Sequence, residues 1–147
     1  MTNIDARLTS ISPVVLSLFR IVFALMYTVH ATQKLFAWPV GTATASGALT
    51  GPAVPMGAWP FWWGGLVEIV AGLLLLTGLA TRAAAFVASG EMAFAYFTQH
   101  LPNGFWPIAN GGELAVLYCF GFFLLVFTGG GALALDAMRE GRRRVRR

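Results

Sequence analysis

The stretch RIVFALMYTVHATQK, residues 20–34, decides the fold. It is apolar along most of its length, but one set of polar residues recurs at helical spacing: Arg20, Tyr27, His30 and Lys34. Residues three, four or seven apart lie on one face of an α-helix. Because every ionisable side chain of the stretch lies on that face, we expect the face to meet other helices or a water-filled cavity.

The composition excludes an ordinary soluble enzyme, a disordered chain and a coiled coil. Of the 147 residues, 57% are hydrophobic and 11% are charged, and the mean hydropathy is +0.70. A soluble domain has about 25% charged residues. The net charge of +4 comes from the C-terminus and not from a surface patch, so we expect no nucleic-acid partner. Six of the ten basic residues lie there: Arg139, Arg142, Arg143, Arg144, Arg146 and Arg147.

Four stretches are long and apolar enough to cross a bilayer, which takes about 20 residues. The sequence therefore predicts an all-α integral membrane protein, a four-helix bundle formed by residues 1–136 and followed by a basic tail at 137–147. Ser12 and Pro13 are typical of an N-cap and a first helical position, so we expect the first helix to begin there. The predicted spans are about 13–36, 61–79, 82–100 and 111–128.

The distribution of basic residues predicts the orientation. Arg7, Arg82 and the C-terminal arginines fall on one side of four spans, whereas the connections at 38–60 and 101–110 contain no Lys or Arg. The positive-inside rule then places both termini in the cytoplasm. The tryptophans gather at the opposite ends of the spans, as in an interfacial aromatic belt: Trp38, Trp59, Trp62, Trp63 and Trp106.

Ionisable residues inside the spans are the main indication of function, since each costs about 2.5–3.5 kcal/mol to insert. From the helical rise, Lys34 and Glu113 lie roughly 5 Å deep, and His30 and Glu68 roughly 10–12 Å deep. We therefore expect the pairs Lys34–Glu113 and His30–Glu68, and we expect the deeper Glu91 to hold a proton. The full set is Arg20, His30, Lys34, Glu68, Glu91, His100 and Glu113.

The acidic residues lie on helix faces of different composition. Glu68 lies between Gly65 and Gly72, and such small residues are expected where helices approach closely. Residues three or four apart form one helix face in each of the other two spans. In the third span the face is formed by Ala84, Ala88, Glu91, Ala95 and Thr98, and in the fourth by Glu113, Leu117, Phe120 and Leu124.

Structural interpretations remain open for several of these residues. Glu113 fits a capping box that begins at Asn110, and Arg20 can pair with backbone carbonyls. A buried network of ion pairs that fixes helix register is a further alternative for Glu68 and Glu91. We expect no metal site, because no local ligand spacing supports one and Lys34 and Arg20 would oppose a cation.

The order and spacing of the motifs resemble the DoxX family of small four-helix bacterial membrane proteins. The resemblance extends from about Arg20 to Asp136. It rests on Arg20, His30 and Lys34, then Glu68, GLATR at 78–82, Glu91, Met92 and His100, then NGGE at 110–113 and Leu135–Asp136.

The resemblance implies a protein of the bacterial plasma membrane, and relatives include a subunit of a thiosulfate:quinone oxidoreductase. We therefore predict an oxidoreductase component that handles a quinone or a similar lipophilic molecule. His30 and Glu68 would exchange protons, Lys34 would polarise a carbonyl, and Glu91 would relay protons. The remaining members of the set, Arg20, His100 and Glu113, would support these residues.

The sequence contains no haem, flavin or iron–sulfur motif, so this function requires a redox partner protein or an external thiol or sulfide donor. Whether the chain is itself an enzyme stays open. One alternative is a small proton-coupled transporter or channel, which would need a homo-oligomer because four helices are few. Another is a non-enzymatic structural or assembly subunit of a membrane redox complex.

Overall fold

The computed structural model describes residues 3–145, and it confirms the prediction of an all-α protein. Within these residues there is no strand, and Thr42 and Gly51 form an isolated bridge in the loop at 37–60. A π-helical turn, Tyr96–His100, and a 3-10 turn, Leu101–Asn103, follow the third helix. The α-helices are α1 (Asn3–Phe36), α2 (Phe61–Thr77), α3 (Thr81–Ala95), α4 (Pro107–Asn110), α5 (Glu113–Thr128) and α6 (Leu135–Val145).

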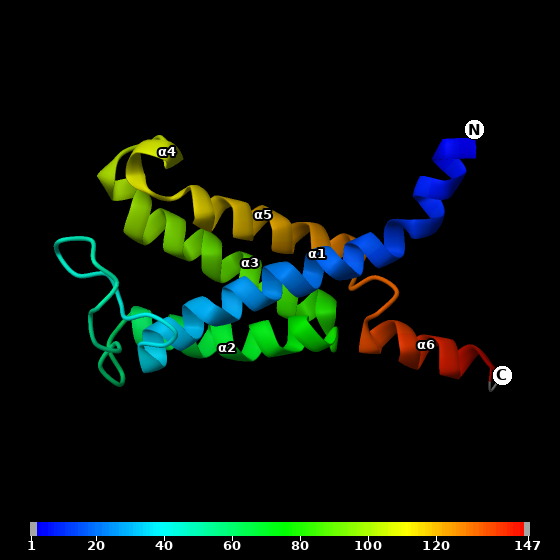
Figure 1. The fold of residues 1–147 in the computed structure, drawn as a ribbon, viewed down its shortest axis with the longest axis horizontal. Helices are drawn as coiled ribbons and strands as arrows, with labels where there is room; N and C mark the ends of the chain where they lie inside the picture. The colour runs from blue at the N-terminus through cyan, green and yellow to red at the C-terminus, as the bar shows by residue number, and fades with distance from the viewer. Residues whose placement is uncertain (1–2, 146–147) are drawn as a thin grey trace.

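Helices α1, α2, α3 and α5 lie side by side along the long axis of the molecule (Figure 1). Helix α1 packs mainly on α2 and α3 mainly on α5, and α2 also contacts α3. The loop at 37–60 and α4 lie at one end, here called the outer end. The N-terminal turns of α1 and helix α6 lie at the opposite, inner end, so the two ends of the chain are on the same side of the molecule (Figure 1).

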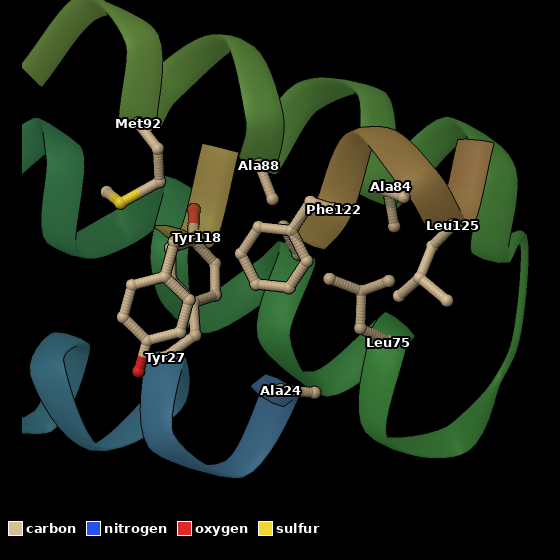
Figure 2. Packing of buried hydrophobic residues seen from close by; sticks show 11 residues of the cluster. Ala24, Tyr27, Leu75, Ala84, Ala88, Met92, Tyr118, Phe122 and Leu125 are labelled. Carbon is tan, nitrogen blue, oxygen red and sulfur yellow. The ribbon is translucent and has the colours of Figure 1, made fainter. Parts of the chain in front are cut away.

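The core between these helices combines small and large apolar side chains (Figure 2). Ala24, Ala84 and Ala88 let the helices approach, and Leu75 and Phe122 fill the space between them. Packing of this kind is expected where no hydrophobic effect drives helices together. The outward faces carry large apolar side chains that are more than half exposed, including Val22, Val70, Phe86 and Phe120.

In the part of the chain that the structure describes, α1 is the one helix that is long and apolar enough to cross a membrane. It begins at Asn3, so the predicted start at Pro13 is wrong. Pro13 cannot donate to the carbonyl of Thr9, and the Ser12 hydroxyl donates to it instead, at 2.9 Å. The first turns of α1 bend away from the rest of the helix (Figure 1), as a proline inside a helix causes.

The other predicted spans differ from the helices mainly at their ends. Helix α2 stops at Thr77, where Gly78 adopts the left-handed conformation of a C-cap. The predicted tail from residue 137 is helical as far as Val145, and its last two residues lie outside the described part.

Charged side chains at the inner end bind the backbone. Arg20 is buried and donates to the carbonyls of Leu75 and Leu76 at the end of α2, the latter at 2.8 Å. Arg82 donates in the same way to Val126 (2.7 Å) and Phe127 (2.8 Å) at the end of α5. The two arginines therefore satisfy the carbonyls that each helix leaves free at its C-terminus.

Asp136 satisfies the opposite kind of helix end. Its carboxylate accepts hydrogen bonds from the N–H groups of Ala80 (2.9 Å) and Thr81 (2.8 Å) at the start of α3. Partial burial raises the pKa of Asp136, but the hydrogen bonds from Thr81 and Ala80 lower it more, so the pKa lies below its ordinary value of 3.8.

We expect Asp136→Asn to lower the free energy of unfolding by about 1 kcal/mol at neutral pH, because the charged cap of α3 is lost. Since the pKa of Asp136 is lowered by folding, its contribution is present above pH 3.8 and is lost as the pH falls through the folded-state value. Thermal unfolding in detergent between pH 7 and 3 should show the two proteins converging at acid pH. A constant difference would contradict the assignment.

Candidate functional site

A cavity of about 430 Å³ opens at the outer end between α1, α2, α3 and α5, and we call it the outer pocket. Its lining is mostly apolar and aromatic, with a small number of polar side chains among them. This composition is typical of sites for small molecules. The pocket brings together five of the seven ionisable residues predicted from the sequence: His30, Lys34, Glu68, Glu91 and His100.

Helix periodicity aims the side chains of α1 into the pocket. Tyr27, His30 and Lys34 all line it, as their spacing predicts. Glu68 reaches it from α2, where glycines allow α1 to pack closely. A Cβ on Gly72 would clash with the Thr28 hydroxyl, so these two helices can approach only because position 72 has no side chain.

Lys34 and Glu68 form an ion pair, with Nζ 2.7 Å from Oε1. The predicted pairs of Lys34 with Glu113 and of His30 with Glu68 are therefore wrong. The helical rise gives the depth of backbone positions, but side chains tilt toward the N-terminus of their helix. Lys34 thus points inward from α1 and Glu68 outward from the antiparallel α2, and their charged ends meet although their backbones differ in depth.

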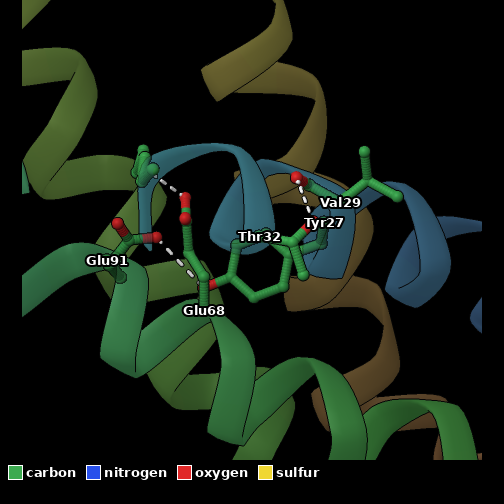
Figure 3. A network of polar contacts seen from close by, with 6 residues as sticks. Tyr27, Val29, Thr32, Glu68 and Glu91 are labelled. Carbon is green, nitrogen blue, oxygen red and sulfur yellow. Dashed lines mark hydrogen bonds and ion pairs between the residues drawn. The ribbon is translucent and has the colours of Figure 1, made fainter. Parts of the chain in front are cut away.

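Glu91 takes a different partner, the hydroxyl of Tyr27, which donates to its Oε2 at 3.0 Å (Figure 3). The carboxyl group of Glu91 and the ammonium group that is paired with Glu68 both lie next to Gly64 of α2. A Cβ at that position would lie 3.3 Å from Glu91 Oε1 and 4.0 Å from Lys34 Nζ. The pocket therefore holds two carboxyl groups close to one ammonium group, and the ammonium is bonded to Glu68.

Two buried polar atoms of the pocket have no hydrogen-bond partner in the described residues. They are the second carboxylate oxygen of Glu68, Oε2, and the hydroxyl of Tyr118. Both side chains are almost fully buried, with exposed fractions of 1% and 3%. Buried polar atoms are nearly always paired, so these two atoms are exceptions within the lining of the pocket.

The two histidines occupy different parts of the lining. His30 lies edge-on to Tyr118, with ring centroids 6.0 Å apart. His100 is in the π-helical turn, where Nδ1 is 3.2 Å from the carbonyl oxygen of Asn110. His30 is thus next to the ring of Tyr118, whereas His100 also holds the connection to α5 in place.

Two predicted members of the cluster lie elsewhere. Arg20 is at the inner end, where it pairs with backbone carbonyls as one of the structural interpretations expected. Glu113 is the exposed first residue of α5 and does not line the pocket. Its face carries exposed residues, Leu117 and Phe120 among them, so it points away from the other helices. The N-cap of α5 is Gly112, and its N–H donates to Oδ1 of Asn110 at 2.8 Å, so the capping box expected with Glu113 does not form.

Tyr118 lines the pocket but is not among the site residues predicted from the sequence. The inward face of α5 is formed by Ala115, Tyr118, Phe122 and Leu125. The spacing of these four residues is as helical as that of the Glu113 face, and the whole helix is apolar, so periodicity could not choose between them. The presence of Glu113 favoured the face of α5 that the structure shows to point outward.

The loop at 37–60 contributes to the mouth of the pocket. Its residues Trp59 and Pro60 line the cavity, and the Trp59 ring contacts Phe94 of α3, with centroids 6.0 Å apart. The N–H of Val54 donates to the carbonyl of Lys34 at 2.7 Å, which fastens the loop to the end of α1. The loop therefore forms part of the wall, a point that the sequence left open.

Comparison with known proteins identifies relatives but no described activity. The family model named DoxX matches residues 15–101. An uncharacterized protein of Haemophilus influenzae is 45% identical over 127 residues, which cover 84% of this chain and 90% of the relative. No solved structure matches the chain.

The ion pair predicts unequal effects of its two partners. Glu68 cannot reach water, whereas the Lys34 side chain is 24% exposed. Lys34→Met should therefore cost about 3 kcal/mol of unfolding free energy, and Glu68→Gln less, because the lysine can hydrate.

The double variant Lys34→Met, Glu68→Gln is the control, since it leaves no unpaired charge. It should recover much of the stability that Lys34→Met loses in thermal unfolding in detergent. A double variant less stable than both single variants would contradict the pairing.

Proposed function

The chain belongs to the DoxX family, and from this premise and the geometry of the outer pocket we propose that it is a multi-pass membrane protein that binds a quinone or a similar lipophilic carbonyl compound. The observation that carries the proposal is the pair of unpartnered buried atoms, Glu68 Oε2 and the Tyr118 hydroxyl, in a cavity that is otherwise mostly apolar. A carbonyl or hydroxyl group on an apolar ring fits both features.

The proposed membrane arrangement has four spans. Helix α1 is long enough alone, and α2 and α5, with 17 and 16 residues, extend about 25 Å, close to the hydrocarbon thickness. Their outward faces are apolar, as lipid contact requires. By the positive-inside rule the inner end, with Arg82 and Arg139, faces the cytoplasm of a bacterial cell.

The residues of the pocket suit proton transfer to a carbonyl. Reduction of a quinone adds two electrons and two protons and leaves a hydroxyl on each former carbonyl. Lys34 compensates one of the two carboxylates, so Glu91 is the acid that we assign a proton to donate. Tyr118 would donate a hydrogen bond to a carbonyl oxygen, Glu68 would accept one from the hydroxyl of the reduced form, and His30 would exchange protons beside them.

The electrons must come from outside the pocket. A redox partner protein, or a thiol or sulfide that reaches the outer end, would supply them. The proposed role is therefore that of an oxidoreductase component, and a structural subunit that only presents the pocket to its partner is the alternative within the same complex. A second copy of the chain could complete either assembly.

A proton-coupled transporter fits the structure less well. Between the outer pocket and Arg20, the core is mostly apolar and includes Leu75, Phe122 and Leu125 (Figure 2). A proton path across the protein would have to cross this layer, where the buried hydroxyl of Ser89 is bonded to the carbonyl of Cys119.

Tyr118→Phe tests ligand binding. The hydroxyl has no partner to lose, so thermal stability should stay the same or rise, whereas affinity for a benzoquinone should fall about tenfold through one lost hydrogen bond. Quenching of tryptophan fluorescence reports binding, since Trp59 and Trp63 line the pocket.

Tyr96→Phe is the matched control. The Tyr96 hydroxyl bonds the carbonyl of Phe105 outside the pocket, so this variant should bind the quinone normally. Mass spectrometry of lipophilic molecules that copurify in mild detergent should also find a quinone. Failure of the wild-type protein to bind or retain any quinone would overturn the proposal.

A further inference from the structure

A second cavity, of about 400 Å³, lies between residues 66–74 of α2 and residues 80–87 at the start of α3, and we call it the furrow. Its α2 wall is formed by Leu66, Val67, Val70, Ala71 and Leu74, and its α3 wall by three alanines and a valine. No side chain of the lining carries a polar atom, so the furrow suits a hydrocarbon and not a polar group.

The furrow adjoins the outer pocket. Val67 lines both cavities. On α3 the lining of the furrow ends at Val87 and that of the outer pocket begins at Glu91, one helical turn further. Helices α2 and α3 therefore line both the outer pocket, with its few polar side chains, and the wholly apolar furrow on the inner side of it.

We infer that the furrow holds the hydrocarbon tail of the molecule whose carbonyl head occupies the outer pocket. The inference rests on the proposed function and names its ligand more closely, as an amphiphile with a compact polar head and a long apolar tail. Glu68, with its unpaired Oε2, directly follows Val67 in the chain. The polar side chain that would bond the head of the ligand is therefore adjacent in sequence to a residue that would contact its tail. From Val67 to Leu74 the furrow extends about 10 Å, close to the length of a decyl chain.

The furrow is open at its side. Val70 and Val87, on opposite walls, are 59% and 50% exposed, and in the proposed orientation this side faces lipid. Ala71, Ala83 and Ala84 keep the space free, because larger side chains would fill it. A tail could thus enter from the hydrocarbon layer while its head moves into the pocket, and neither part would cross the lipid headgroups.

The test compares two probes on the full-length protein in detergent: a benzoquinone with a decyl tail and the same benzoquinone without it. Val87→Phe narrows the furrow, and Val22→Phe is the control, since Val22 is equally exposed (52%) on α1 and lines neither cavity. Quenching of tryptophan fluorescence should show about tenfold weaker binding of the decyl probe to Val87→Phe. Binding of the tail-less probe, and of either probe to Val22→Phe, should be unchanged.

Each other outcome overturns the inference. If wild-type protein binds both probes and Val87→Phe leaves the decyl probe unaffected, the tail lies elsewhere and the proposed function stands. If Val87→Phe removes a copurified phospholipid without weakening the decyl probe, the furrow belongs to a lipid acyl chain. If neither probe binds wild-type protein, the proposed function fails as well.

The second variant, Ala83→Leu, guards against a folding defect in Val87→Phe. It fills the furrow from an exposed position on the same wall. It should show the same selective loss of the decyl probe with an unchanged melting temperature, and an equal loss of both probes in the two variants would overturn the inference.

Discussion

The ion pair between Lys34 and Glu68 determines how the outer end is organised. It joins α1 to α2 at a place where one partner, Glu68, is shut off from water. By holding the single ammonium group of the pocket against Glu68, it leaves Glu91 to the Tyr27 hydroxyl and leaves Oε2 of Glu68 without a partner. The ion pair that stabilises the packing of α1 on α2 thus also leaves one carboxylate oxygen of the pocket without a hydrogen-bond partner.

The two ends of the molecule use their charged groups differently. At the inner end, Arg20, Arg82 and Asp136 bond to the free backbone groups at the ends of α2, α5 and α3. Those charges stabilise the fold. At the outer end, Glu68 and Tyr118 keep polar atoms that no described residue uses, inside a cavity large enough for a ligand. Burial of a charge is therefore a poor guide to function here, because buried charges stabilise the packing of helices at both ends.

The sequence predicted the helical class and the polar stripe of α1, because composition and a period of 3.6 residues determine both. It also predicted that His30, Lys34, Glu68 and Glu91 meet at one end. It could not predict the pairing of Lys34 with Glu68, which depends on the length and tilt of side chains on antiparallel helices. Nor could it identify the inward face of α5, since apolar residues occupy every face of that helix.

The two helical hairpins show why the Glu113 prediction was wrong. Helices α1 and α2, and likewise α3 and α5, are joined at the inner end by an arginine of the first helix that bonds the last carbonyls of the second. Glu68 and Glu113 nevertheless occupy different places. Glu68 lies two turns inside α2, behind Gly64 and facing α1, whereas Glu113 is the first residue of α5 and faces outward. The inner ends are alike because both must satisfy a helix C-terminus, but no such requirement acts on the outer ends, where one hairpin supplies a buried acid and the other supplies Tyr118.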